Sequence, residues 1–162
     1  MAISVKLTDR LKKIAAFIEN GSAVADIGTD HGYLPVYLAQ NGLARHIIAS
    51  DISAGSLSAA RRSADKYGVS DQILFITASG LSGVKEAEVD TVVISGVGGE
   101  TIIGILKDAP WTRRQGISLI LQPQTKKDVL FEWLRENGYV IRDSAQALER
   151  GRSYIIILAA GV

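Results

Sequence analysis

The chain has no cysteine and only two histidines among its 162 residues. Without cysteine, neither a disulfide framework nor a thiolate metal site can form. The two histidines, His31 and His46, lie far apart in the sequence, and such a pair does not make a metal site by itself. We therefore expect a protein that holds no metal.

Long hydrophobic runs and an excess of one charge are also missing. No apolar stretch approaches the ~18–20 residues that span a membrane, and residues 1–6 lack the apolar core of a signal peptide. We therefore expect a cytoplasmic protein with no membrane partner. The formal net charge is +1, so composition alone does not indicate nucleic-acid binding. At 47% hydrophobic and 22% charged residues, the chain is typical of a globular protein, and we expect residues 1–162 to form a single domain.

Runs that are typical of strands alternate with stretches that are typical of helices. A leading helix within residues 1–20 is predicted from apolar residues spaced four, three and four apart, with Ser4 or Thr8 as its cap. Alternating strands and helices favour a parallel sheet that is covered on both faces. The predicted strands lie near residues 23–27, 46–50, 73–77, 91–95 and 117–121, and the predicted helices near 32–41, 54–67, 100–107 and 126–136.

The end of the chain breaks this alternation. Residues 139–142 and 154–158 both read as strands, and the stretch between them, 143–152, is too short for a comfortable helical crossover. The pair is therefore predicted to be antiparallel. The expected fold is α/β and Rossmann-like, with a mostly parallel seven-stranded sheet and a C-terminal antiparallel hairpin. That layout is typical of a class I methyltransferase, whereas a dinucleotide-binding Rossmann domain usually continues in parallel units.

Two carboxylates follow the first two predicted strands. Asp26 and Gly28 end the first strand, Gly32 completes the turn, and Asp51 ends the second strand. Glycines at such a turn let a ligand approach the backbone, and an acid at the second strand tip can accept from both ribose hydroxyls. Asp26 would repel a pyrophosphate but would suit the cationic amino-acid end of S-adenosylmethionine. The alternatives are that Asp26 bonds loop amides and that Asp51 caps the next helix, a position that Ser53 fits better.

Further polar residues fall in the same predicted layer. Asp30 and His31 lie inside the glycine turn, close to where a reacting methyl group would lie, although a lone histidine is more often structural or solvated. Glycine-rich residues 95–99 end the fourth strand, and Gln122-Pro123-Gln124 ends the fifth. Close backbone approach and an amide side chain there would suit a ligand, a base edge or a backbone phosphate. A tight turn and a helix-start signal remain the alternatives at these two places.

Residues 26–35 read Asp-Ile-Gly-Thr-Asp-His-Gly-Tyr-Leu-Pro, and this run resembles the signature of bacterial tRNA adenine-N1 methyltransferases that modify adenine 22. The resemblance covers nearly the whole chain, in order. The segment at residues 95–99 reads Ser-Gly-Val-Gly-Gly, where the family usually has Ala-Gly-Met-Gly-Gly. The other matching positions are Leu7, Arg10, Leu11, Ser50–Ile52, Leu121–Pro123, Asn137–Tyr139 and Tyr154.

Two departures from the family pattern affect its implications. Residues 78–81 read Ala-Ser-Gly-Leu where the family usually has Gly-Asp-Gly-Leu. That aspartate would accept a hydrogen bond from the cofactor's adenine amine, and Ser79 would accept a weaker one, by roughly 1 kcal/mol. Family members also carry a further helical, coiled-coil-like domain that is implicated in holding tRNA. We expect that domain to be absent here and tRNA affinity to be weakened accordingly.

The resemblance implies methyl transfer from S-adenosylmethionine to N1 of an adenine in tRNA. The main task of such an enzyme is to align N1, the methyl carbon and the sulfur. Asp30, with His31, is the implied catalytic pair, because a nearby acceptor favours the positive charge that develops on adenine. The implied cofactor-binding residues are Asp26, Gly28, Thr29, Asp51, Ile52, Ser79, Gly80, Ser95, Gly96 and Gly98. The implied substrate-binding residues are Arg10, Tyr33, Gln122 and Tyr154.

Other functions stay open at this stage. The chain could methylate another acceptor, either a small molecule or a protein, or it could be a catalytically weak module that binds S-adenosylmethionine. A dinucleotide oxidoreductase is the least favoured reading, because no second domain is available to hold a hydride acceptor. Cofactor binding and turnover on tRNA would separate these possibilities, and the sequence leaves the oligomeric state open.

Overall fold

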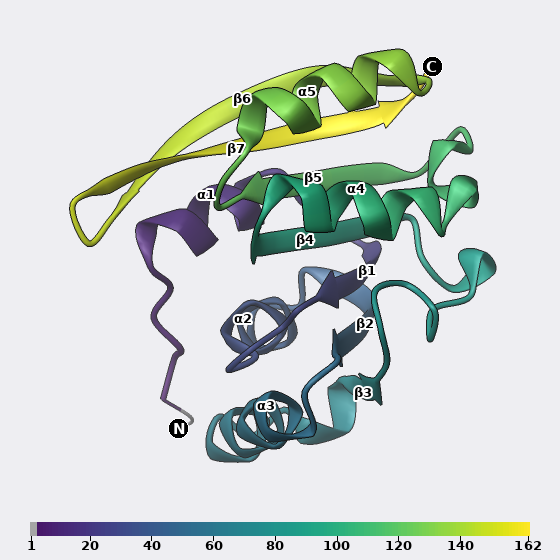
Figure 1. Ribbon diagram of the computed structural model, residues 1–162. Coiled ribbons are helices and arrows are strands. Elements are labelled where there is room, and N and C mark those ends of the chain that lie inside the picture. The colour runs from purple at the N-terminus through teal and green to yellow at the C-terminus, as the bar shows by residue number, and fades with distance from the viewer. Residues whose placement is uncertain (1–2) are drawn as a thin grey trace.

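The structure is a computed structural model that describes residues 3–162, so Met1 and Ala2 of the expected domain lie outside the described residues. Figure 1 shows one sheet with helices on either side of it. The strands are β1 (Ser22–Ile27), β2 (Ala44–Asp51), β3 (Leu74–Thr77), β4 (Thr91–Val97), β5 (Ser118–Pro123), β6 (Tyr139–Glu149) and β7 (Arg152–Gly161). The helices are α1 (Asp9–Ala16), α2 (Tyr33–Gln40), α3 (Ala54–Lys66), α4 (Gly99–Lys107) and α5 (Lys127–Glu136), with short 3-10 helices at Ser70–Gln72, Glu86–Glu88 and Pro110–Arg113.

The seven strands form one sheet in the order β3-β2-β1-β4-β5-β7-β6. Strands β1 to β5 pair in parallel, and β7 pairs antiparallel with both β5 and β6. This confirms the predicted mostly parallel sheet with an antiparallel C-terminal hairpin. Neighbours on both sides of β1 come from opposite halves of the chain, so the ligand crevice of such a sheet is expected beside β1 and β4.

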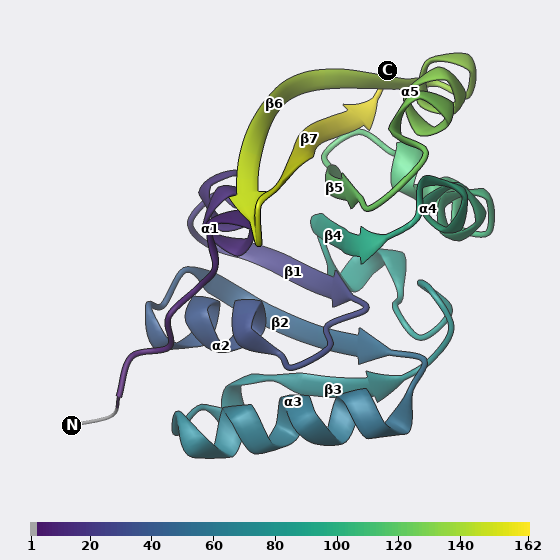
Figure 2. The ribbon, with the colours of Figure 1, turned by 60° about the vertical axis from the view of Figure 1, so that its left-hand side comes forward.

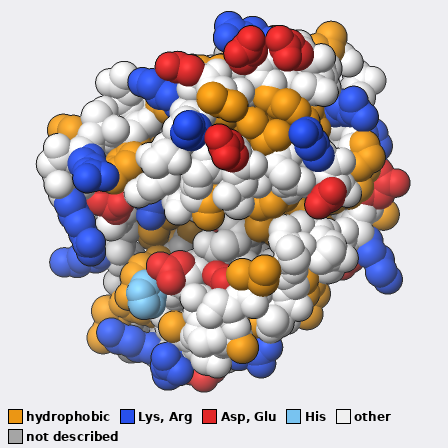
Figure 3. Space-filling model, in the orientation of Figure 1, with side chains coloured by type: hydrophobic (Ala, Val, Ile, Leu, Met, Phe, Trp, Pro, Cys, Tyr) orange, Lys and Arg blue, Asp and Glu red, His pale blue; other side chains and the backbone are white. Residues whose placement is uncertain are grey.

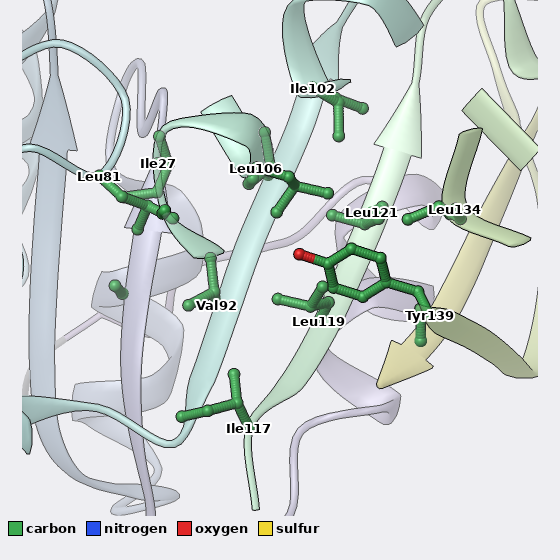
Figure 4. Packing of buried hydrophobic residues seen from close by; sticks show 14 of the residues in the cluster. Ile27, Leu81, Val92, Ile102, Leu106, Ile117, Leu119, Leu121, Leu134 and Tyr139 are labelled. Carbon is green, nitrogen blue, oxygen red and sulfur yellow. The ribbon is translucent and has the colours of Figure 1, made fainter. Parts of the chain in front are cut away.

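The two faces of the sheet bury separate hydrophobic clusters. Successive residues of a strand point to opposite faces, and Val24 and Ala25 accordingly belong to different clusters. Helices α4 and α5 cover one face with Ile102, Leu106 and Leu130, while α1 and α2 cover the other. Figure 2 shows α4 and α5 on one side of the sheet, and Figure 4 shows the side chains that they bury against β4 and β5.

The predicted ends of three elements, α1, β6 and β7, were wrong. The leading helix was expected to run to Asn20-Gly21, but it is capped by Thr8 and ends at Ala16, because the chain turns at Phe17. The strands of the hairpin are longer than residues 139–142 and 154–158, and the expected ten-residue connection is a two-residue turn at Arg150-Gly151. Exposed polar residues in the middle of β6 hid its strand pattern in the sequence.

Gly32 couples the first glycine turn to α3. Its φ is +73°, and a Cβ atom at this position would lie 2.8 Å from Ala60 Cβ. We expect Gly32→Ala to lower the free energy of unfolding by about 2–4 kcal/mol, since backbone strain and crowding add. Gly42→Ala is the matched control, because Gly42 has φ +60° with nothing within 4 Å of the added atom. Urea unfolding of both variants measures the difference, and equal losses would show that Ala60 imposes no restriction.

Candidate functional site

A cavity of about 630 Å³ opens at the carboxyl edge of the parallel strands. This volume lies in the range of small-molecule sites. The turns after β1, β2, β3 and β4 line it together with α1 and the tip of the β6–β7 hairpin. Residues predicted for the site that line this cavity are Arg10, Asp26, Gly28, Thr29, Asp30, His31, Tyr33, Asp51, Ile52, Ser79, Gly80, Ser95, Gly96 and Tyr154.

Asp26 lies at the buried end of β1, with 4% of its surface exposed. Its Oδ2 accepts a hydrogen bond of 2.8 Å from the Thr29 hydroxyl. Burial raises the pKa of Asp26 from 3.8 to about 7, and the Thr29 hydrogen bond and the charge of Arg10 offset only part of this rise. A cation that enters the cavity would favour the ionised carboxylate, so Asp26 is suited to hold a positively charged group.

Asp51 ties the second strand to the first glycine turn. Its Oδ2 accepts from the backbone N–H of Asp30 at 3.1 Å, and its Oδ1 accepts from the N–H of Ser53 at 2.9 Å. Each carboxylate oxygen can accept a second hydrogen bond, so acceptor capacity remains toward the cavity. The Ser53 hydroxyl caps α3 by accepting from Ser56 N–H, which removes capping of that helix as the reason for Asp51.

Asp30, His31 and Tyr33 form the outer rim of the cavity. Asp30 has φ +56°, and its side chain is 71% exposed. His31 Nε2 lies 3.9 Å from Asp30 Oδ2, and the His31 ring stacks on Tyr33 with 5.5 Å between ring centroids. Figure 3 shows acidic side chains beside a histidine at a hollow in the surface. The exposed pair can therefore reach a large substrate that docks over the mouth.

Arg10 is held by residues more than 80 positions away in the sequence. Its Nε donates to Glu149 Oε2 at 3.0 Å, and its Nη1 donates to Gln122 Oε1 at 3.2 Å. Gln122 is fully buried, and the same oxygen accepts from the N–H of Gly96 at 2.9 Å. Gln122 does not line the cavity, although we expected it to bind substrate. Its geometry is that of a positioning residue that fixes Arg10 and the glycine turn after β4.

Gly98 also differs from its expected place. It precedes α4 and does not line the cavity, and a Cβ atom there would lie 3.0 Å from Thr125 Oγ1. Thr8, Gln124, Glu149 and Arg150 line the cavity but were not among the predicted site residues, and nothing in the sequence indicated Glu149 or Arg150. Glu149 and Arg150, at the tip of the hairpin, belong to no recognisable sequence motif. They reach the mouth of the cavity only because β6 and β7 are long. Gln124 had a weak signal, because it follows the strand-ending Gln122-Pro123 pair.

Two features are absent from residues 3–162. No group of three or more His, Asp or Glu side chains in this part of the chain is placed to hold a metal ion. None of the helices in this part is long and apolar enough to cross a membrane. The candidate site is therefore described by its carboxylates, its glycine turns and its aromatic rim.

The mixed seven-stranded sheet and the carboxylates at the ends of β1 and β2 define a Rossmann-like methyltransferase core. In agreement, the family described as "Methyltransferase domain" matches residues 7–157. The tRNA (adenine(22)-N(1))-methyltransferase of Bacillus subtilis (strain 168) is 36% identical over 155 residues, which are 96% of this chain. This chain therefore belongs to the methyltransferase domain family, and it is similar to bacterial tRNA (adenine(22)-N(1))-methyltransferases.

Solved structures agree with this grouping. The crystal structure of the B. subtilis M1A22 tRNA methyltransferase TrmK has a TM-score of 0.91 and 35% identity, covering 98% of this chain and 68% of that chain. M. capricolum TrmK in complex with S-adenosyl-homocysteine has a TM-score of 0.84 and 36% identity, covering 96% of this chain and 69% of that chain. The present chain spans 65% of the length of the B. subtilis relative.

Proposed function

We propose that this domain transfers a methyl group from S-adenosylmethionine to N1 of an adenine in tRNA. The observation that carries the proposal is the pair Asp26 and Asp51 at one cavity, in a chain 36% identical to a B. subtilis enzyme named for this reaction. The structure of M. capricolum TrmK with S-adenosyl-homocysteine supports the same class of cofactor. A tRNA substrate would also place the protein in the cytoplasm.

The residues at the cavity suit S-adenosylmethionine. A buried carboxyl group with a raised pKa gains from a nearby cation, and Asp26 would hold the amino group of the methionine end. Asp51 would accept from the ribose hydroxyls with the lone pairs that its backbone partners leave free. Ser79, at the exposed turn after β3, would accept from the adenine amine. When bound, S-adenosylmethionine supplies a methyl group activated by its sulfonium sulfur.

Adenine N1 carries a lone pair, so no base is required to create the nucleophile. N1 forms a bond to the methyl carbon as the carbon–sulfur bond breaks, and the electron pair of that bond goes to sulfur. Positive charge then develops on adenine, and Asp30, on the rim of the cavity, would stabilise it. N1 lies on the pairing edge of the base, so a paired target has to leave its stack. Tyr33 and Tyr154, which line the cavity, would then stack on the base.

The role of Asp30 leads to a test by substitution. Asn tolerates the left-handed backbone of Asp30, and the Asp51 hydrogen bond uses the Asp30 backbone N–H, which the change keeps. We expect Asp30→Asn to lower turnover about tenfold or more and to change cofactor affinity less than twofold. Single-turnover methylation and calorimetric cofactor titration measure the two quantities. Full turnover with normal cofactor binding would remove Asp30 from the reaction.

The proposed function is tested directly with labelled S-adenosylmethionine and unmodified bulk tRNA, followed by identification of the modified nucleoside. We expect N1-methyladenosine. Transfer of label to another nucleoside would overturn the choice of N1. Cofactor binding without transfer would favour a different acceptor or a binding module. Failure to bind S-adenosylmethionine at all would overturn the proposal at its first step.

A further inference from the structure

Left-handed backbone at non-glycine residues gathers at one edge of this molecule. Among residues 3–162, the non-glycine residues with positive φ are Asp30 (56°), Lys126 (59°) and Arg150 (50°). All three are charged, and they follow the carboxyl ends of β1, β5 and β6. Side chains other than Asn and Asp rarely adopt this conformation, and residues that do so collect at functional sites. Asp30 belongs to the proposed catalytic rim, whereas Arg150 has no role in the function described above.

Arg150 adopts a backbone conformation that is unfavourable for arginine in the turn that it forms. It joins β6 to β7 together with Gly151, and both residues have positive φ, 50° and 76°. Two-residue hairpin turns of this kind favour Asn-Gly, because Asn accepts the left-handed conformation more readily than Arg does. Turn geometry therefore does not explain an arginine at this position, and its side chain requires another reason.

The turn stands at the mouth of the cavity. The last β5 residue that pairs with β7 is Leu121, opposite Ile157, so the five residues 152–156 of β7, about 16 Å of strand, continue beyond the last pairing with β5. Figure 1 shows the hairpin projecting past the end of β5 and beside α1. Two contacts fix it to α1: Arg10 pairs with Glu149 at 3.0 Å, and Asp9 Oδ2 accepts from Leu148 N–H at 2.9 Å. Arg150 itself lines the cavity.

Two arginines at the tip, Arg150 and Arg152, form no ion pair within 4.0 Å among residues 3–162. Glu149 is paired with Arg10. Both arginines are exposed. Figure 3 shows Lys and Arg side chains along the left edge of the face that carries the hollow, which is the side where the hairpin projects in Figure 1. Guanidinium groups bind phosphate through paired hydrogen bonds.

We propose that the hairpin tip is a phosphate clamp, in which Arg150, assisted by Arg152, binds the RNA backbone beside the adenine that enters the cavity. This inference rests on the proposed function. Arg10 is the guanidinium that lies inside the cavity near Asp26, whereas Arg150 is exposed at the mouth, where a long polyanion passes. The strained backbone then aims the arginine at the substrate and not at the small cofactor.

The test compares Arg150→Asn with Arg150→Lys and a control, Arg142→Gln. Asn keeps a side chain that suits the turn, and Lys keeps the charge. Arg142 is an exposed arginine of β6, the strand that leads into the turn, and it lies at the irregularity between Ile141 and Asp143, about 26 Å along the hairpin from Arg150. Anisotropy of a labelled unmodified tRNA transcript over a salt series gives the affinity and its salt dependence. Calorimetry gives the cofactor affinity, and thermal unfolding gives stability.

The clamp predicts that Arg150→Asn weakens tRNA binding about tenfold at low salt and reduces the salt slope by about one. Stability and cofactor affinity should be unchanged or higher, and Arg150→Lys should recover most of the affinity. If Arg150→Asn behaves like Arg142→Gln, or if it weakens cofactor binding in place of tRNA binding, the clamp is wrong while methyl transfer stands. If the unmutated chain neither binds nor methylates tRNA, the proposed function fails and the clamp fails with it.

Discussion

The Asp26→Asn variant is expected to bind S-adenosylmethionine about 10- to 100-fold more weakly than the unmutated chain and yet to be more stable at pH 8. The loss follows from removing a charge-assisted hydrogen bond to the amino group, worth roughly 1.5–3 kcal/mol. The gain in stability follows from removing a buried carboxyl group. Burial makes its ionisation unfavourable and raises its pKa to about 7. The Asn side chain can still accept from the Thr29 hydroxyl.

The stability gain should depend on pH in one direction. Between pH 4 and 7 the folded chain binds a proton at Asp26 that the unfolded chain has released, so the free energy of unfolding falls as pH rises through this window. The Asp26 pKa rises from 3.8 to about 7 on folding, and this difference limits the loss in the free energy of unfolding above pH 7 to roughly 4 kcal/mol. Asp26→Asn has no group that ionises at this position, so its free energy of unfolding does not fall in this way as pH rises. Its advantage in Tm should therefore reach several degrees at pH 8 and vanish near pH 4.

Thermal unfolding at pH 4, 6 and 8, together with calorimetric titration of the cofactor, measures both parts of this expectation. Asp71→Asn is the matched control, because Asp71 is an exposed aspartate in a short 3-10 helix that does not line the cavity. A Tm advantage that is equal at all three pH values would contradict the buried proton at Asp26. Unchanged cofactor affinity in Asp26→Asn would exclude a contact between Asp26 and the amino group.

The alternation of strand and helix was sufficient to predict the sheet, because buried parallel strands such as β4 contain a continuous apolar stretch, here residues 92–94. The same logic failed at β6, where Asp143 and Ser144 interrupt the pattern on an exposed edge. The leading helix was predicted too long, since its apolar spacing continues through Ile18 although the backbone has already turned at Phe17. Periodicity reports which residues are buried, and it does not report where the backbone hydrogen bonds stop.

The part of the site that is fixed by the order and direction of the strands could be predicted from the sequence. Residues that end parallel strands meet at one edge, so Asp26 and Asp51 could be placed together from their positions alone. Contacts that depend on distant side chains could not be foreseen. Arg10, Gln122 and Glu149 meet only because α1 packs against the long hairpin, and no sequence pattern fixes that angle. Gln122 therefore looked like a ligand contact and proved to be buried beneath Arg10.

Asp51→Asn is expected to reduce cofactor affinity about 100-fold, nearly as much as Asp51→Ala. Both oxygens of Asp51 accept backbone N–H groups, so an amide NH₂ in either position would face the N–H of Asp30 or Ser53. Two donors cannot bond each other. The nearly isosteric substitution therefore loosens the glycine turn and also weakens acceptance from the ribose hydroxyls. Calorimetric titration of S-adenosylhomocysteine into both variants gives the comparison.

The direct contribution of Asp51 to ribose binding can be separated from its hold on the glycine turn by changing the ligand. Removal of the ribose 2′-hydroxyl from S-adenosylhomocysteine should weaken binding to the unmutated chain about tenfold, since one hydrogen bond to a charged acceptor is lost. The same removal should cost Asp51→Ala almost nothing, because that variant has no acceptor to leave unpaired. The two changes, Asp51→Ala in the protein and loss of the 2′-hydroxyl in the ligand, form a double-mutant cycle. Its coupling energy measures the direct contact between Asp51 and the ribose. Equal losses in the two proteins would mean that Asp51 acts only through the Asp30 and Ser53 amides.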